Sequence, residues 1–169
     1  MKDNLFVECP GCGVRLPDRT LDPVKRFNAS GECLQMFHDL SCWTLVRHDG
    51  RFIHQHAIDA YEVQHAGGRT RPITVMFGLI GLYLALEKGY SGRQVQLAHM
   101  KIGKTRRNWP ILEPPSQPAE LTVMDVLRAE TDEEKEKMLM RWASSVWMIW
   151  EPRHRFVREI TKKVLHSRP

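Results

Sequence analysis

The sequence predicts an all-α fold: a helical bundle of about five helices with a small N-terminal zinc-knuckle loop or hairpin. Apolar residues recur at helical spacing over most of the stretch from residue 31 to residue 165. Capping residues and glycine stops divide that stretch into separate helices. The two cysteines closest to each other in the sequence precede the helices, in the motif Cys9-Pro10-Gly11-Cys12-Gly13. We expect a single domain, because 169 residues can enclose one hydrophobic core.

Residues 1–30 form a metal-knuckle segment. Pro10 fixes one backbone angle, and the glycines on either side of Cys12 permit left-handed conformations, as a tight loop around a metal ion requires. A short hairpin is expected around Leu5–Val7 and Val14–Leu16. This segment has too few apolar residues to fold alone, so a bound metal would take the place of a core.

Residues 31–102 contain the core helices. Ser30 is a suitable N-cap for a first helix reaching about His48, and Asp49-Gly50 is a turn signal. A second helix is expected from about Phe52 to Ala66, stopped by the following pair of glycines. Apolar residues at helical spacing predict that the first and second helices pack against each other.

Pro72 suits the first turn of a third helix that ends at Gly89. This helix is apolar on most faces and is therefore expected at the centre of the bundle. Gly78 and Gly81 lower its helix propensity, and we interpret them as sites of close packing by a neighbour. Ser91 then caps a shorter fourth helix, to about Ile102.

Residues 103–121 contain four prolines and no periodic pattern, which predicts an irregular loop. The C-terminal helices occupy residues 122–169. Thr122 can cap one helical turn through Leu127, and Thr131 with Glu134 forms a capping box that opens a long final helix. Pro152 should kink or break this helix, which then continues to about Leu165.

The chain has 25 Lys and Arg against 20 Asp and Glu, for a formal net charge of +5. Much of the excess lies between Lys101 and Arg107 and in the tail from Arg153 to Arg168. Binding of nucleic acid by this basic C-terminal half, through Arg106, Arg107 and the tail, is one alternative function. No small-molecule or protein partner can be identified from the sequence.

The longest apolar run, Ile73–Leu86, has 14 residues, fewer than the roughly 20 that a membrane span needs. No signal peptide is visible after Met1. We therefore expect a cytoplasmic protein without a membrane segment. In a reducing compartment, a Cys-x-x-Cys pair indicates a metal site before a disulfide.

Cys9 and Cys12 have the spacing of half a Zn²⁺ site. If the first two helices form an antiparallel hairpin folding at Asp49-Gly50, Cys33 and His65 lie about equally far from the turn. They would then be side by side at the end where the N-terminal loop enters. Three thiolates and one imidazole are an accepted zinc ligand set. The alternatives are a redox Cys-x-x-Cys pair or a disulfide, and a buried or helix-terminal role for Cys33 and His65.

Possible catalytic residues follow one stripe of the second helix, where His54, Tyr61 and His65 are spaced at multiples of about one turn. Together with His154, which follows the Pro152 break, they would line a polar cleft beside the metal. The alternative interpretation is a set of buried polar groups with backbone partners. Asp59 lies off the stripe, facing the third helix or supporting the site.

Three other side chains are interpreted as structural. His56 and His99 have no companion that would make a site, and Cys42 is expected to be an inert buried thiol within the first helix.

The sequence resembles a bacterial domain family of unknown function. The resemblance rests on the knuckle from Cys9 to Gly13, on the segment Asp59-Ala-Tyr-Glu-Val-Gln-His65, and on Trp147-x-x-Trp150 with His154. The resemblance implies that the family has a cysteine at the position of Cys33 and a histidine at the position of His54. It implies no activity, because the family has none assigned. That family usually has proline after the Gln-His pair, where this chain has Ala66. The chain also bears a looser likeness to DinB-type four-helix metal bundles. It lacks the His-x-x-x-His pair of those proteins, so this likeness is an analogy of fold only.

These observations favour a zinc-binding protein of unassigned activity, whose metal is structural and held by Cys9, Cys12, Cys33 and His65. One alternative is a small metalloenzyme, a hydrolase or thiol transferase, in which His54, Tyr61 or His154 assists chemistry at the metal.

Overall fold

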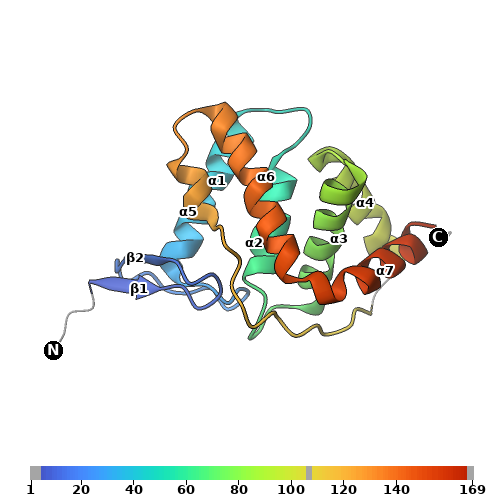
Figure 1. Cartoon of the computed structure of the whole chain (residues 1–169), viewed down its shortest axis with the longest axis horizontal. Helices are drawn as coiled ribbons and strands as arrows, with labels where there is room; N and C mark the ends of the chain where they lie inside the picture. Colours follow the sequence, from blue (N-terminus) through green and yellow to red (C-terminus); the bar gives the residue numbers. More distant parts are fainter. Residues whose placement is uncertain (1–4, 106–107, 167–169) are drawn as a thin grey trace.

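The computed structural model describes residues 5–105 and 108–166 and confirms a mostly helical fold (Figure 1). A two-stranded hairpin, β1 (Phe6–Glu8) and β2 (Arg15–Pro17), precedes the helices. Within the described ranges there are seven α-helices and one 3₁₀ turn: α1 (Gly31–Val46), α2 (His54–Gln64), α3 (Pro72–Lys88), α4 (Gly92–Thr105), α5 (Val123–Arg128), α6 (Asp132–Ile149), η1 (Glu151–Arg153) and α7 (His154–His166).

The helices lie in a broad bundle with α2 and α6 in the middle (Figure 1). α1 and α5 flank them on the side of the hairpin, and α3, α4 and α7 flank them on the other side. The loop before α5 runs across the end of the bundle where α2 ends. The hairpin and the following loop therefore meet the bundle at that same end.

The hairpin forms where the sequence predicted it, shifted by about one residue. Val7 pairs with Leu16 in antiparallel register, and Leu16 is buried while its neighbours are exposed. The Cys9–Gly13 knuckle is the connection between the two strands.

α1 begins at the expected cap, because the Ser30 hydroxyl accepts a hydrogen bond from the backbone N–H of Cys33. α2 begins two residues later than expected, because Phe52 adopts a left-handed conformation with φ 55° that a helix does not permit. Both carboxylate oxygens of Asp49 accept backbone N–H groups of Arg51 and Ile53, which closes the turn between the helices.

α3 is apolar and mostly buried, as predicted, but it lies beside α2 rather than in the middle of the bundle (Figure 1). Its packing explains the two glycines within it. A Cβ atom at Gly81 would clash with the carboxylate of Asp59 on α2, and one at Gly78 would clash with Val63. The absence of these two side chains lets α2 approach α3 closely. Asp59 is fully buried, and burial raises its pKa well above the usual value.

The C-terminal part has the predicted boundaries. Thr122 and Thr131 both form complete capping boxes, with Asp125 and Glu134 respectively. Pro152 lies in η1, which separates α6 from α7. The described residues form seven helices rather than the predicted five or so. The two additional helices are α5, predicted as a single turn after Thr122, and α7, predicted as the continuation of the final helix after Pro152.

A hydrogen-bonded contact fixes α6 against the end of α2. The amide of Gln64 accepts a hydrogen bond from the indole N–H of Trp142 at 2.8 Å and donates one to the carbonyl of Leu121 at 2.8 Å. Trp142 is fully buried. One side chain thus ties together α2, α6 and the loop that precedes α5.

In the part of the chain that the structure describes, no helix combines the length and the apolar character that crossing a membrane requires. Arg106, Arg107 and Arg168, on which the alternative of nucleic-acid binding partly rests, lie outside the described residues.

Gly81→Ala should lower the free energy of unfolding by about 1–3 kcal/mol, because its Cβ must displace the buried carboxylate of Asp59 or separate α2 from α3. Urea unfolding of the metal-loaded protein measures this change. Gly103→Ala in α4 is the matched control. A Cβ there would meet only Phe77 at 3.8 Å, so we expect stabilisation by about 0.5–1 kcal/mol. Equal effects of the two substitutions would contradict the proposed packing.

Candidate metal centre

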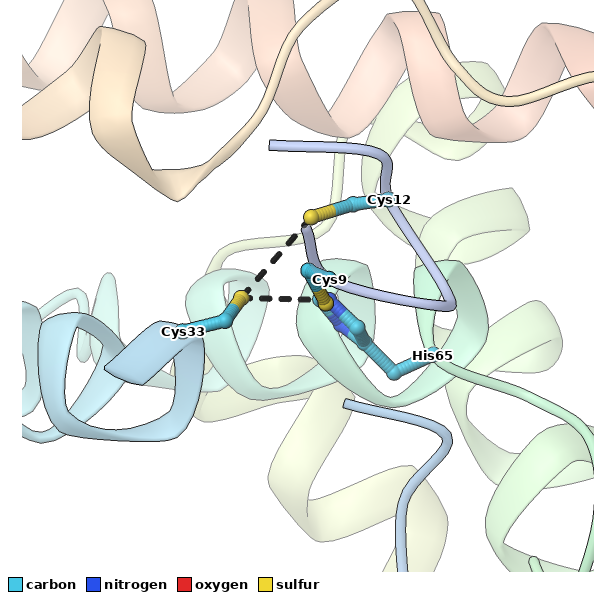
Figure 2. A group of neighbouring side chains, drawn as sticks. All are labelled: Cys9, Cys12, Cys33 and His65. Carbon is cyan, nitrogen blue, oxygen red and sulfur yellow. Dashed lines mark hydrogen bonds between the residues drawn. The ribbon is translucent and has the colours of Figure 1, made fainter. Parts of the chain in front are cut away.

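Four side chains from three segments converge at the end of the bundle beside the hairpin (Figure 2). Cys9 and Cys12 come from the knuckle, Cys33 from the first turn of α1, and His65 from the residue that ends α2. Their potential ligand atoms all lie within 4.8 Å of one another. All four side chains are buried, with exposed fractions of 0–4%. The structure therefore brings together the four residues that the hairpin argument grouped.

Two of the distances within this group are close to those around a tetrahedral ion. With Zn–S near 2.3 Å and Zn–N near 2.0–2.1 Å, a tetrahedron places two sulfurs about 3.8 Å apart and a sulfur and a nitrogen about 3.6 Å apart. The Sγ atoms of Cys12 and Cys33 are 3.8 Å apart. The Sγ of Cys33 lies 3.4 Å from Nε2 of His65. The four residues thus form a Cys₃His group suited to a metal such as zinc.

Backbone hydrogen bonding orients the imidazole of His65 for this role. Its Nδ1 lies 2.9 Å from the carbonyl oxygen of Tyr61, one turn earlier in α2. Because a carbonyl can only accept, Nδ1 carries the proton and donates it. Nε2, which faces the sulfurs, is then the nitrogen with a free lone pair. The end of α2 therefore selects the tautomer that binds a metal.

The knuckle is held closely against His65. A Cβ atom at Gly11 would clash with the carbonyl oxygen of Asn28 and would lie 2.8 Å from Cδ2 of His65. The backbone N–H of Asn28 donates to the carbonyl of His65 at 3.0 Å. The knuckle itself closes through the N–H of Gly13 donating to the carbonyl of Cys9 at 2.8 Å, with Gly13 at φ 74°. Only glycine fits at position 11, and a side chain at position 13 would be strained.

Tyr61 forms a wall of the site. Its ring stacks on Phe37 with centroids 4.1 Å apart and lies 4.0 Å from the ring of His65. Its hydroxyl is directed at the Sγ of Cys33, 3.8 Å away. Burial raises the pKa of Tyr61 above its usual range, so the hydroxyl keeps its proton and serves as a donor to sulfur.

The three sulfurs are too close to be ionised together without a cation. Hydrogen bonds from Cys12 and Cys33 hold the pKa of Cys9 far below its usual range. Hydrogen bonding to Cys12 and Cys9, with burial, raises the pKa of Cys33 far above its usual value. For Cys12, a hydrogen bond from Cys33 lowers the pKa, but the Cys9 sulfur and burial raise it to about 12. The metal-free site therefore contains one thiolate and two thiols.

The structure does not bring His54 and His154 to this group. His54 lies at the opposite end of α2, about 16 Å along the helix axis from His65. Its Nδ1 is 2.8 Å from the hydroxyl of Thr44. Nε2 of His154 is 2.9 Å from the carbonyl of Trp147, and the two rings stack 3.7 Å apart. The catalytic roles of His54, Tyr61 and His154 remain predictions.

Three residues shape the site: Gly11, Asn28 and Ser30 fix the knuckle and the start of α1. The sequence indicated Ser30 as an N-cap and Gly11 as a loop glycine, but it gave no signal for Asn28 or for the close approach of Gly11 to His65. The expectation for Cys42 was wrong. It is exposed, because it faces away from the bundle on the outer side of α1.

Zinc binding at neutral pH should release about two protons per chain, from Cys12 and Cys33, since both thiols must ionise to bind. The apparent affinity should accordingly rise about 100-fold per pH unit between about pH 6 and 8, and fall as the pH is lowered. Calorimetry in buffers of different ionisation enthalpy counts the protons, and competition with a chromophoric chelator gives the affinity. A pH-independent affinity would contradict this account.

A family model matches residues 7–151 of this chain, from the hairpin through α6 to the start of η1. The match includes all four residues of the metal centre. Neither curated proteins nor solved structures gave a match. The resemblance identified from the knuckle and the Asp59–His65 segment is thereby confirmed: the chain belongs to a family of unknown function, DUF5946.

Proposed function

We propose that this protein binds one Zn²⁺ ion through Cys9, Cys12, Cys33 and His65, and that the ion has a structural role. The observation that carries the proposal is the convergence of four buried ligand atoms within 4.8 Å of one another, with two of their separations close to those of a zinc tetrahedron. The free thiols of these residues favour a reducing compartment, and we infer a cytoplasmic location.

Four protein ligands complete a tetrahedral zinc site and leave no position for substrate or water. Burial of all four supports the same conclusion, because a catalytic zinc ion must be reached by its substrate. The hydroxyl of Tyr61 faces Cys33 rather than solvent, where it would offset part of the net negative charge of three thiolates and one Zn²⁺. This arrangement favours structural zinc over the hydrolase or thiol-transferase alternative.

The ion would join the N-terminal segment to the helical bundle. β1 and β2 have three residues each and are joined by the knuckle loop. A two-stranded hairpin this short is not stable alone. Zinc would link this hairpin to the first turn of α1 and the end of α2.

The fixed knuckle forms one wall of a cleft of about 620 Å³. The end of α2, including Gln64, and the proline-rich stretch 114–118 form the other walls. We propose that zinc holds this cleft in shape as a binding surface, which makes the protein a zinc-stabilised binding module rather than a zinc enzyme.

Cys33→Ser should remove most of the zinc from a protein that otherwise contains about one ion per chain, because it deletes one corner of the tetrahedron. Elemental analysis after dialysis against a competing chelator measures the zinc content. Cys42→Ser is the matched control, since Cys42 lies on the same helix but is exposed and outside the group, and it should retain its zinc. Full zinc retention by Cys33→Ser would exclude the proposed ligand set.

Replacement of zinc by Co²⁺ tests whether the site is closed. The wild-type protein should show the visible absorption of a four-coordinate, thiolate-rich ion, and added azide or imidazole should not change it, because no coordination position is open. His65→Ala creates an open position, so the spectrum of that variant should respond to imidazole. A wild-type spectrum that responds in the same way would favour the metalloenzyme alternative.

A further inference from the structure

A second concave site lies at the other end of the bundle, where α2 begins and α3 ends. We name it the α6 groove; its volume is about 820 Å³, within the range that accommodates a small organic ligand. It is lined by Arg51, Ile53, His56, Ala85, Gly89, Tyr90, Ser91, Gln94, Glu136, Lys137, Met140 and Arg141. None of these residues belongs to the metal centre.

One wall of the groove is fixed by close packing. The backbone N–H of Arg93 donates to the carbonyl of Arg51 at 2.8 Å, and a Cβ atom at Gly92 would clash with the carbonyl of Phe52. The turn before α2 is therefore held against the start of α4. The groove is preformed rather than dependent on a mobile loop.

Apolar and polar groups are separated within the groove. Ile53, Ala85 and Met140 provide apolar contact surface. His56 lies among them and is 6% exposed. Its Nδ1 is shielded from solvent and has no hydrogen-bond partner in the described part of the chain. Because this nitrogen is shielded, a ligand in the groove could contact other parts of the imidazole ring but not Nδ1.

The cations of the groove are only partly neutralised. Glu136 is the single acidic residue among the lining residues, and its two carboxylate oxygens pair with Arg47 and Arg51, the latter at 3.0 Å. Lys137 and Arg141 follow each other at one-turn spacing on α6 and form no salt bridge with any described residue. Lys137 is near enough to Glu134, one turn earlier, to help lower the pKa of that carboxyl group, but the two are not in contact as a salt bridge. Two exposed cations thus border an apolar floor.

We propose that the α6 groove binds a small organic anion with an apolar body. The apolar body would contact Ile53, Ala85 and Met140. The acidic group would lie between Lys137 and Arg141, neither of which is held in a salt bridge with a described residue. This proposal does not depend on the role of the metal centre.

The test uses two probes and the zinc-loaded full chain. One probe is 8-anilinonaphthalene-1-sulfonate, an aromatic anion, and the other is N-phenyl-1-naphthylamine, which has the same apolar body and N–H but no charge. Fluorescence titration should show saturable binding of the anion and at least about tenfold weaker binding of the neutral probe. Similar affinities for both would overturn the proposal, because the cations would then contribute nothing.

Variants locate the two kinds of contact. The double substitution Lys137→Gln with Arg141→Gln should weaken the anion about tenfold and leave the neutral probe unaffected. Lys104→Gln with Lys162→Gln, which removes the same charge from exposed positions away from the groove, is the control and should change neither affinity. Met140→Ala should weaken both probes several-fold, since both place the same apolar body in the groove. Full anion affinity in the Lys137 and Arg141 double variant would refute the proposal.

A spectroscopic readout identifies the site directly. In protein with ¹³C-labelled methionine methyl groups, the signal of Met140 should shift on addition of the anionic probe. The signal of Met148, which is also on α6 but 60% exposed and outside the groove, should not shift. Binding of the probe without a shift of Met140 would place it elsewhere and overturn the assignment.

Discussion

Three buried sulfur atoms beside one imidazole nitrogen form the constraint on which the N-terminal half of this protein depends. These sulfurs lie within 4.8 Å of one another, and at such separations without solvent three thiolates repel one another too strongly to coexist. The metal-free chain can retain them only by keeping two as thiols. A divalent cation removes this conflict and replaces weak S–H contacts by coordinate bonds, so that metal affinity becomes folding free energy for a segment that has little core of its own.

The helical bundle prepares this site before any ion is bound. Ser30 fixes the first turn of α1 and hence Cys33, while the carbonyl of Tyr61 fixes the tautomer of His65. Gly11 lets the knuckle touch the imidazole ring. Since the ligands on α1 and α2 are held by regular helical geometry, the part that the ion would add to them is the short hairpin.

Much of this arrangement followed from the sequence, because helix caps and a hairpin of known turn position place residues by simple counting. Cys33 and His65 were identified in that way, since their distances from Asp49-Gly50 match. The same counting could not show that His54 faces Thr44 or that His154 stacks on Trp147, since spacing along one helix does not specify its neighbours. The exposure of Cys42 was mispredicted for the same reason.

α2 shows most clearly why the pattern of polar residues was ambiguous. Nine of its eleven residues are buried, yet six of those nine carry a polar group, so no apolar stripe distinguishes an inner face. Most of these polar groups have a partner: Gln55 donates to Asp59, Glu62 pairs with Arg26, and Gln64 bridges Trp142 and Leu121. Nδ1 of His56 and Oδ2 of Asp59 are buried without a hydrogen-bond partner among the described residues. Burial raises the pKa of Asp59 well above its usual value, so this carboxyl group keeps its proton and avoids the larger cost of a buried charge. A helix whose buried face is this polar is positioned by individual side-chain contacts rather than by an apolar stripe, and spacing alone therefore could not assign its faces.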